Sequence, residues 1–341
     1  MPGIAKQPDF PIFRKSGRSI TGAIAVATLV LLSGCASKGT IAPELQTIDQ
    51  GRLPPADLTL NIPGLGPCTD NPDRSLHLNS RQPVTVLVHG CFGSSGLFRG
   101  LAQVLAFHGQ QSACFTYNDR DSLVVSSGQL TSALDMLAQQ MDNTQVTVIG
   151  HSQGALIARK SLVSTLPDPI TTDNLQLRLV TVSGPFAGIA AANQCGNPVM
   201  RALTLGLTDL LCQIITGDKW SEITYSSEFI LEPGPLHPQV HDYLKIITDE
   251  RDSCRQWKNA TCIESDYVFS LEEQYNEVID HDPATKIVEV RAGHVEIIGD
   301  KRVSPDKLIA ILQDNGILNP TEPELRPDLI LLLTRLYGKT D

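Results

Sequence analysis

The sequence lacks several features that would each have indicated a particular class of protein. Its cysteines and histidines are scattered and form no pair of Cys-x-x-Cys motifs, which argues against a structural zinc site. Basic residues are few, because 27 Lys and Arg stand against 37 Asp and Glu, for a formal net charge of −10. Neither nucleic acid binding nor broad electrostatic adhesion to anionic lipid is therefore expected. No internal repeat is evident, and 341 residues with 41% hydrophobic side chains predict an ordinary globular protein.

An apolar run near the N-terminus is too short to cross a membrane as a helix. It extends from Ile20 to Leu32, whereas a bilayer core of about 30 Å needs roughly 20 residues. Four basic residues precede this run, and Leu-Ser-Gly-Cys ends it. The arrangement is typical of a secretory signal, and it predicts export.

The residues Leu32-Ser33-Gly34-Cys35 resemble the lipobox of bacterial lipoproteins. The resemblance implies that residues 1–34 are a removed signal peptide and that Cys35 carries lipid; an ordinary signal with a chance cysteine is the alternative. Removing four basic side chains and one acidic one would change the formal charge from −10 to −13, so lipid would hold the mature chain to its membrane. Ala36 is unlike the aspartate that retains many lipoproteins in the inner membrane. This favours the periplasmic face of the outer membrane in a bacterial cell envelope.

The cysteines other than Cys35 are expected to form disulfides in an oxidising compartment. There are seven of them, so at least one stays free or pairs elsewhere. Two local bridges are plausible, although connectivity cannot be read from the sequence: Cys195 with Cys212, and Cys254 with Cys262.

Residues 35–82 are rich in Pro, Gly and Asp and are interpreted as a lipidated tether with an irregular approach to the domain. From residue 83, apolar strands alternate with helical patterns, which predicts an α/β protein with a mostly parallel sheet covered by helices on both faces. The expected strands are Val84–Val88, Ala113–Tyr117, Val146–Ile149, Leu177–Val182, Tyr267–Leu271 and Lys286–Val290; the expected helices are Leu97–Phe107, Leu130–Met141, Ala155–Leu166 and one opened by Ser304-Pro305-Asp306.

About 80 residues separate Leu177–Val182 from the next expected strand. Within this insert, Pro198–Gly217 has apolar residues at helical spacing. This helix either caps a pocket or buries its apolar face on the sheet, and the pattern does not decide between them.

One serine stands in a Gly-His-Ser-Gln-Gly motif between an expected strand and an expected helix. The motif has the form GxSxG, and chance alone supplies this pattern often, so its context carries the prediction. A sharp turn from strand to helix needs small residues on both sides of Ser152 and exposes the serine hydroxyl beside a helix N-terminus. The alternative is a structural serine in a glycine turn. The motif in this setting resembles the nucleophile elbow of the α/β-hydrolase family, and the likeness covers about residues 83–315. It implies a hydrolase domain at 83–341 with a cap insert after the sixth strand, at about 186–262.

A second motif precedes the elbow. The segment from His89 to Ser95, which follows the strand Val84–Val88, resembles the HGxxG oxyanion loop of bacterial lipases. The resemblance implies that the backbone amides of Cys91 and Gln153 stabilise an oxyanion, and that His89 is structural.

The general base is expected after the last strand of the sheet. His294 lies there in a Gly-His turn, whereas His281 precedes that strand and would lie at the opposite sheet edge. A surface role for His294 is the alternative.

The acid of the triad is harder to assign. Gln274 to Ile279 reads QYNEVI and resembles the QYDEVV of some secreted lipases, whose aspartate is the acid; this chain has Asn276 there. An amide cannot stabilise an imidazolium by charge. Glu273 is therefore favoured, ahead of Glu272, and an orienting Asn276 in a weaker triad is the other possibility.

These residues predict a membrane-anchored serine hydrolase of lipase or esterase type, with Ser152, His294 and Glu273 as the triad and without a metal or cofactor. An acyltransferase or a thioesterase acting on envelope lipids is the second hypothesis, because the same triad serves all of these reactions. A non-catalytic envelope lipoprotein that keeps the fold is the third.

Overall fold

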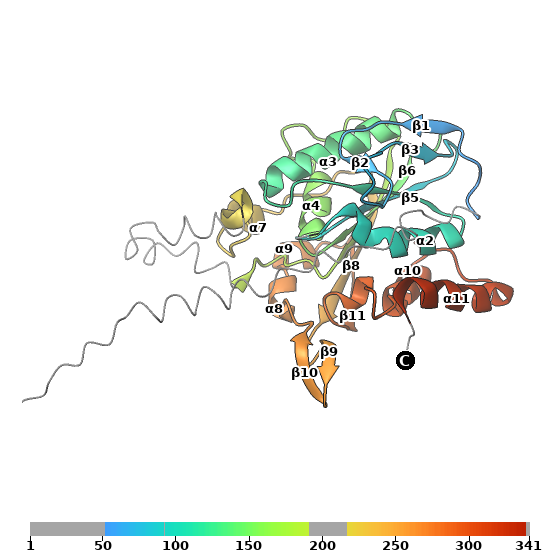
Figure 1. Cartoon of the computed structure of the whole chain (residues 1–341). Coiled ribbons are helices and arrows are strands. Elements are labelled where there is room, and N and C mark those ends of the chain that lie inside the picture. Colours follow the sequence, from blue (N-terminus) through green and yellow to red (C-terminus); the bar gives the residue numbers. More distant parts are fainter. Residues whose placement is uncertain (1–51, 92, 191–216, 339–341) are drawn as a thin grey trace, which may run out of the picture. The chain divides into compact units, whose positions relative to one another are not determined.

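The computed structural model describes residues 52–91, 93–190 and 217–338 (Figure 1). They all belong to one unit, Ile41–Asp341. The predicted helix Pro198–Gly217, apart from its last residue, lies outside the described residues, as do Cys35, Cys195 and Cys212.

A central sheet organises the described residues. It has seven strands in the order β11-β8-β7-β6-β4-β5-β2, of which β2 alone is antiparallel to its neighbour. The central strands are apolar and buried on both faces, as strands covered by helices on each side must be. The bounds are β2 Leu65–Gly66, β4 Val84–Val88, β5 Gln111–Phe115, β6 Gln145–His151, β7 Gln176–Val182, β8 Val240–Asp249 and β11 Thr285–Arg291.

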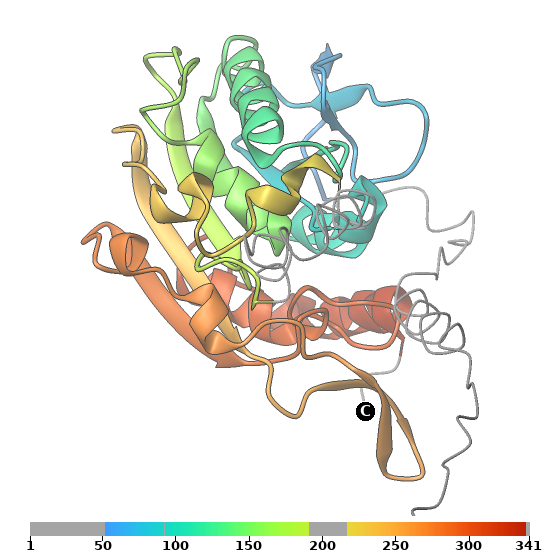
Figure 2. The ribbon, with the colours of Figure 1, turned by 90° about the vertical axis from the view of Figure 1, so that its left-hand side faces the viewer.

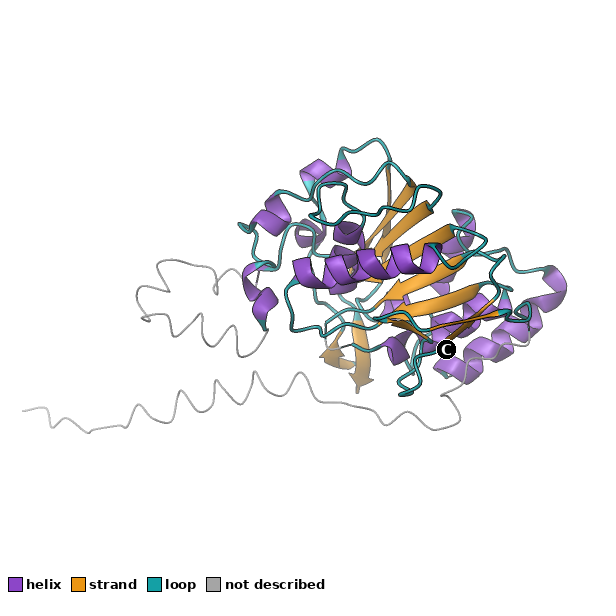
Figure 3. Ribbon diagram, turned by 90° about the horizontal axis from the view of Figure 1, so that it is seen from above, coloured by secondary structure: helices purple, strands orange, loops and turns teal. Residues whose placement is uncertain are grey.

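Helices cover both faces of this sheet (Figures 1 and 3). One core lies under α3 (Leu123–Ala138) and α4 (Gln153–Ser161), which pack on each other and on the middle strands. A second core lies under α2 (Arg99–Phe107), α10 (Asp306–Asp314) and α11 (Arg326–Tyr337). The six parallel strands therefore direct their carboxyl ends, and the loops that follow them, to one edge between the two helical layers.

Shorter elements complete the described fold. β1 (Leu58–Leu60) pairs with β3 (Leu76–Leu78), and β9 (Cys254–Lys258) pairs with β10 (Thr261–Ser265) in a hairpin that projects from the rest of the domain (Figures 1 and 2). The short helices are η2 Ser95–Phe98, η4 Asp218–Ser221, α7 Glu228–Leu231, α8 Leu271–Gln274, α9 Glu277–Asp280, η5 Glu296–Ile298 and η6 Pro323–Leu325. None of the described helices is long and apolar enough to cross a membrane.

Two disulfides join described cysteines. Cys254–Cys262 closes the β9–β10 hairpin, as predicted. Cys68–Cys114 was not foreseen, and it ties the segment after β2 to β5. Segment 35–82, predicted to be irregular, therefore contributes an edge strand, β2, to the central sheet, and the disulfide fixes the chain beside it.

The prediction of an α/β-hydrolase fold is confirmed. Strands β4, β5, β6, β7 and β11 coincide with predicted strands to within two residues at each end, and the helices between them follow in the predicted order. Successive β-α-β units produce such a parallel sheet, because each helix returns the chain to the same end of the sheet before the next strand begins.

Two predictions about the insert are wrong. Strand β8 lies inside the range 186–262 that was assigned to a cap, so the connection between β7 and β8 ends at residue 239. Residues Tyr267–Leu271 form no strand; they run extended into α8. β8 was not predicted as a strand because Lys245, a charged residue, interrupts the apolar run of this segment. The Lys245 side chain is nevertheless buried, with 1% of its surface exposed.

Candidate active site

Ser152 lies at a sharp turn between β6 and α4. Its backbone has φ 57° and ψ −126°, a left-handed conformation that costs a residue with a side chain roughly 1–3 kcal/mol. The two flanking glycines permit this turn, since a Cβ on Gly150 would lie 2.3 Å from the carbonyl oxygen of Gly154. A Cβ on Gly154 would lie 2.2 Å from the carbonyl oxygen of Val88. The GxSxG spacing is therefore a packing requirement among β6, α4 and β4, and it fixes a strained Ser152 at the sheet edge.

The loop after β4 passes directly beside this serine. A Cβ on Gly90 would lie 2.8 Å from Cβ and 3.3 Å from Oγ of Ser152, so the loop backbone is in contact with the serine side chain. Cys91 follows Gly90, and Gln153 follows Ser152 as the first residue of α4. The first amides of a helix have no intrahelical acceptor, so the N–H of Gln153 is available for a ligand. The two predicted oxyanion residues thus lie on the two sides of Ser152.

His294 follows β11 and is held from several sides. Its backbone N–H donates to the carbonyl oxygen of Asp266 at 3.0 Å, and its own carbonyl oxygen lies 2.9 Å from Nε2 of His151. Its ring contacts the ring of His151 at 4.6 Å between centroids and the ring of Phe269 edge-on at 4.9 Å. Burial, and then repulsion from His294, hold the pKa of His151 well below its ordinary value. His151 is therefore neutral, and its Nε2–H donates to the His294 carbonyl.

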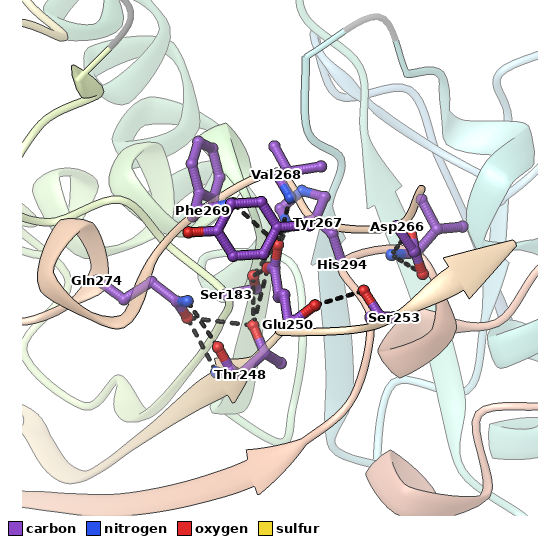
Figure 4. Close-up of polar contacts among 12 residues, drawn as sticks. Ser183, Thr248, Glu250, Ser253, Asp266, Tyr267, Val268, Phe269, Gln274 and His294 are labelled. Atoms are coloured by element: carbon purple, nitrogen blue, oxygen red, sulfur yellow. Dashed lines mark hydrogen bonds and ion pairs between the residues drawn. The ribbon is translucent and has the colours of Figure 1, made fainter. Parts of the chain in front are cut away.

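A buried carboxylate orients this histidine, and it belongs to Glu250, which follows β8. Oε1 of Glu250 lies 2.9 Å from Nδ1 of His294, and the Glu250 side chain is 0% exposed (Figure 4). Its other oxygen, Oε2, accepts from the backbone N–H groups of Val268 and Phe269 at 2.6 and 2.8 Å. Burial alone would raise the pKa of Glu250, but the hydrogen bond and charge interaction with His294 and the two amides outweigh it, so the pKa lies below its ordinary value.

Two hydroxyl groups complete the surroundings of the Glu250–His294 pair. Ser183, which follows β7, donates to Glu250 Oε1 at 2.7 Å and lies 2.9 Å from His294 Nδ1. Thr248 contacts both Ser183 Oγ at 2.8 Å and Glu250 Oε1 at 3.0 Å, and Gln274 holds Thr248 from the other side. With Nδ1 engaged in this network (Figure 4), the remaining ring nitrogen, Nε2, is the one that can accept a proton.

The structure brings none of the three acid candidates to His294. Both oxygens of Glu273 accept from backbone N–H groups: Oε2 from Ser270 at 2.8 Å, in the capping box of α8, and Oε1 from Ala190 at 2.7 Å, in the segment after β7. Asn276 caps α9, and its amide donates to the carbonyl oxygen of Phe186 at 2.9 Å. Glu272 is exposed. The assignment of the acid to Glu273 is corrected to Glu250, because the backbone that was predicted to be a strand instead uses its amides to bind this carboxylate.

Comparison with known proteins identifies the family of this chain. A family model described as palmitoyl protein thioesterase matches residues 84–265, more than half of the chain. The chain belongs to the palmitoyl protein thioesterase family. It is therefore a member of a family of ester-cleaving α/β-hydrolases.

Individual relatives of this thioesterase-family chain include lipases. A triacylglycerol lipase of Pseudomonas fragi is 30% identical over 148 residues, which cover 39% of this chain and 48%, or about half, of that lipase. A Bacillus licheniformis lipase in its mature form aligns with a TM-score of 0.47 and 15% identity, covering 74% of this chain and 97% of the lipase. The propeptide form of the same lipase aligns with a TM-score of 0.49 and 14% identity, covering 76% of this chain and 54% of the lipase.

A third histidine near the site, His89, lies in the loop after β4. His89 is buried, stacks on Tyr117 at 4.4 Å and has Nδ1 2.9 Å from the carbonyl oxygen of Gly90. Burial lowers the pKa of His89, which fits a structural residue that supports the loop of this thioesterase-family member.

Within the ranges that the structure describes, no group of three or more His, Cys, Asp or Glu is arranged to hold a metal ion.

The contact of Glu250 with His294 was not predicted from the sequence. A signal for it exists, because acids of this family follow a strand, and Asp249-Glu250 follows the mostly apolar Tyr243–Thr248. Asp249 itself pairs with Arg251 at 2.7 Å, which leaves Glu250 to turn inward.

Proposed function

We propose that this protein is a membrane-anchored serine hydrolase that cleaves carboxylic esters through an acyl-serine intermediate. The observation that carries the proposal is the buried Glu250–His294 pair at the same sheet edge as the strained Ser152. Paired carboxylate and imidazole groups next to a serine at a strand-to-helix turn are what acyl transfer requires.

Each residue has a distinct task in the proposed reaction. Ser152 Oγ attacks the ester carbonyl carbon while His294 Nε2 takes its proton, and the negative Glu250 stabilises the imidazolium that forms. The carbonyl oxygen becomes an oxyanion and accepts from the amides of Cys91 and Gln153, each such donor contributing roughly 3 kcal/mol. His294 then gives its proton to the leaving alcohol, and the acyl group remains on Ser152. Water, activated by the same histidine, releases the acid.

Covalent labelling tests the serine directly. A fluorophosphonate probe is expected to label the wild-type protein and not Ser152→Ala. Ser161→Ala is expected to keep the label, because the Ser161 hydroxyl is buried but donates to the carbonyl oxygen of Ala158, outside the Glu250–His294 network. In parallel, the wild type is expected to hydrolyse p-nitrophenyl esters. A folded wild type that takes no label and releases no nitrophenol would show that the proposal is wrong.

The family description supports a second candidate reaction, thioester hydrolysis. The geometry serves both, since the oxyanion and the acyl-serine are the same and only the leaving group differs. Competition between an acyl ester and the matching acyl thioester for one enzyme, with kcat/KM for each, separates the two. An added alcohol that intercepts the acyl-enzyme would reveal acyl transfer instead.

Membrane anchorage through Cys35 is part of the proposal and rests on the lipobox resemblance. Cells that express the full chain are expected to incorporate radioactive palmitate into it and to retain it in the outer-membrane fraction. Cys35→Ala is expected to abolish both. Equal membrane retention of the variant would refute anchorage at this residue.

A further inference from the structure

A buried lysine joins the two residues that flank Ser152. Lys219, in η4 of the connection between β7 and β8, has only 2% of its surface exposed. Its Nζ lies 3.1 Å from Cys91 Sγ and 2.6 Å from Gln153 Oε1, and it also donates to the carbonyl oxygen of Asp119. Gln153 Nε2 reaches that carbonyl too, at 3.3 Å. One ammonium group therefore cross-links the loop after β4, the loop after β5 and the start of α4.

The framework around η4 fixes the position of this ammonium. A Cβ on Gly217 would lie 2.2 Å from the carbonyl oxygen of Arg120, so η4 begins in backbone contact with the loop after β5. On its other side, Glu222 accepts from Ser122 Oγ at 2.5 Å and from the N–H of Leu123 at the start of α3. Both anchors lie outside the Lys219 contacts, so the placement of Lys219 does not depend on those contacts alone.

We propose that Lys219 is a positioning residue that sets the geometry of the oxyanion hole. This inference rests on the proposed function, in which the amides of Cys91 and Gln153 are the oxyanion donors. Lys219 touches the side chains of those same two residues and acts through them on the reaction.

The physical reason is that each donor N–H is fixed by the orientation of its own residue. Cys91 lies in a loop, and burial raises the pKa of its thiol, so a neutral thiol accepts from Lys219. Gln153 is on a helix, and its side-chain oxygen receives a charge-assisted hydrogen bond, the stronger kind. Holding both side chains on one ammonium keeps the two amides aimed at one point. Donors that are prearranged in this way stabilise a developing charge without reorganisation.

The test compares Lys219→Met with Lys160→Met in esterase assays. Lys160 is a half-buried lysine of α4 whose ammonium donates to the carbonyl oxygen of Glu232 at 3.1 Å, away from the oxyanion residues. Lys219→Met is expected to lower kcat by at least 10-fold, with KM changed less than threefold, because an oxyanion donor acts only in the transition state. Affinity for an acyl trifluoromethyl ketone, which forms a tetrahedral oxyanion on the serine, is expected to fall by about the same factor as kcat/KM. Lys160→Met is expected to leave all three unchanged.

Gln153→Met provides a second route if Lys219→Met does not fold. It removes the acceptor and keeps the backbone amide, and it is expected to lower kcat with the same small effect on KM. The double variant is expected to lose no more than the larger single loss, since the two residues act as a unit. The inference is overturned if the folded variants keep kcat within threefold of wild type, or if their losses simply multiply. A wild type that cleaves no ester would instead overturn the proposed function, and this inference with it.

Discussion

Replacing Glu250 by Gln isolates its charge, because the amide has nearly the same shape. Glu250 Oε2 faces two backbone N–H groups that cannot rotate, so the new NH2 group is forced toward the Oε1 position. There the hydroxyls of Ser183 and Thr248 can turn, but Nδ1 of His294 must become an acceptor. The proton then sits on Nε2, which is the wrong tautomer for a base.

The expected magnitude follows from this tautomer. In serine proteases the corresponding change from Asp to Asn lowers kcat by about 10⁴, and we expect a loss of about 10³–10⁴ for Glu250→Gln. Weakening the charge-assisted hydrogen bonds of this buried group should also cost roughly 2 kcal/mol of unfolding free energy. Ester turnover and urea unfolding, both at pH 7, measure the two effects.

The matched control is Glu273→Gln, because the sequence favoured Glu273 as the acid of the triad. It contacts backbone N–H groups and not His294, so kcat should stay within threefold of wild type. The assignment of Glu250 is refuted if Glu250→Gln keeps more than a tenth of wild-type kcat, or if Glu273→Gln loses as much activity.

The lowered pKa of Glu250 adds a dependence of stability on pH. Its folded pKa lies below its ordinary value of 4.5, so the carboxylate stabilises the fold above pH 4.5 and this contribution is lost as the pH falls through the folded pKa. The difference in unfolding free energy between wild type and Glu250→Gln should therefore shrink below pH 4.5. A difference that grows on acidification would contradict the direction of the shift.

Three further predictions concern the packing of the elbow, a buried ion pair and the disulfides. Gly154→Ala should destabilise the fold by about 1–3 kcal/mol through overpacking and lower kcat at least 10-fold through displacement of the elbow, as measured by thermal unfolding and ester turnover. Asp280→Asn removes the partner of Lys245, whose side chain is 1% exposed, and should cost about 3–5 kcal/mol in urea unfolding; a cost below 1 kcal/mol would argue against a buried ion pair. Cys68→Ser with Cys114→Ser opens a loop closed over a separation of 46 residues and should lower the unfolding free energy by about 4 kcal/mol, compared with about 2.5 kcal/mol for the hairpin bridge, whose separation is 8.

Much of the fold and part of the site could be predicted from the sequence, for physical reasons that differ between residues. The elbow was predictable because its glycines are demanded by backbone contacts, and such contacts leave a motif. The position of His294 was predictable because a loop after the last strand of a parallel sheet must lie at the same edge as Ser152.

Glu250, the proposed acid of the triad, was not predictable in the same way. Its strand, β8, contains the buried Lys245, and burial of that ammonium depends on Asp280, which lies 35 residues farther along the chain. Periodicity reads only neighbouring residues, so it takes Lys245 as a sign of exposure. The segment Tyr267–Leu271 was misread for a related reason, since its extended backbone donates to a carboxylate where a strand would pair with another strand.

The two variable positions of GHSQG turn out to be fixed by their surroundings. His151 reaches forward to the backbone of His294, 143 residues away in the sequence, and Gln153 meets an ammonium 66 residues away. A search that accepts any residue at these two places would therefore overlook two side chains that make long-range contacts in this chain. An elbow taken from another hydrolase, with different residues at the two positions, would keep the nucleophile but lose the contacts to His294 and Lys219. To transfer this elbow to another protein, His294 and Lys219 would have to be transferred as well.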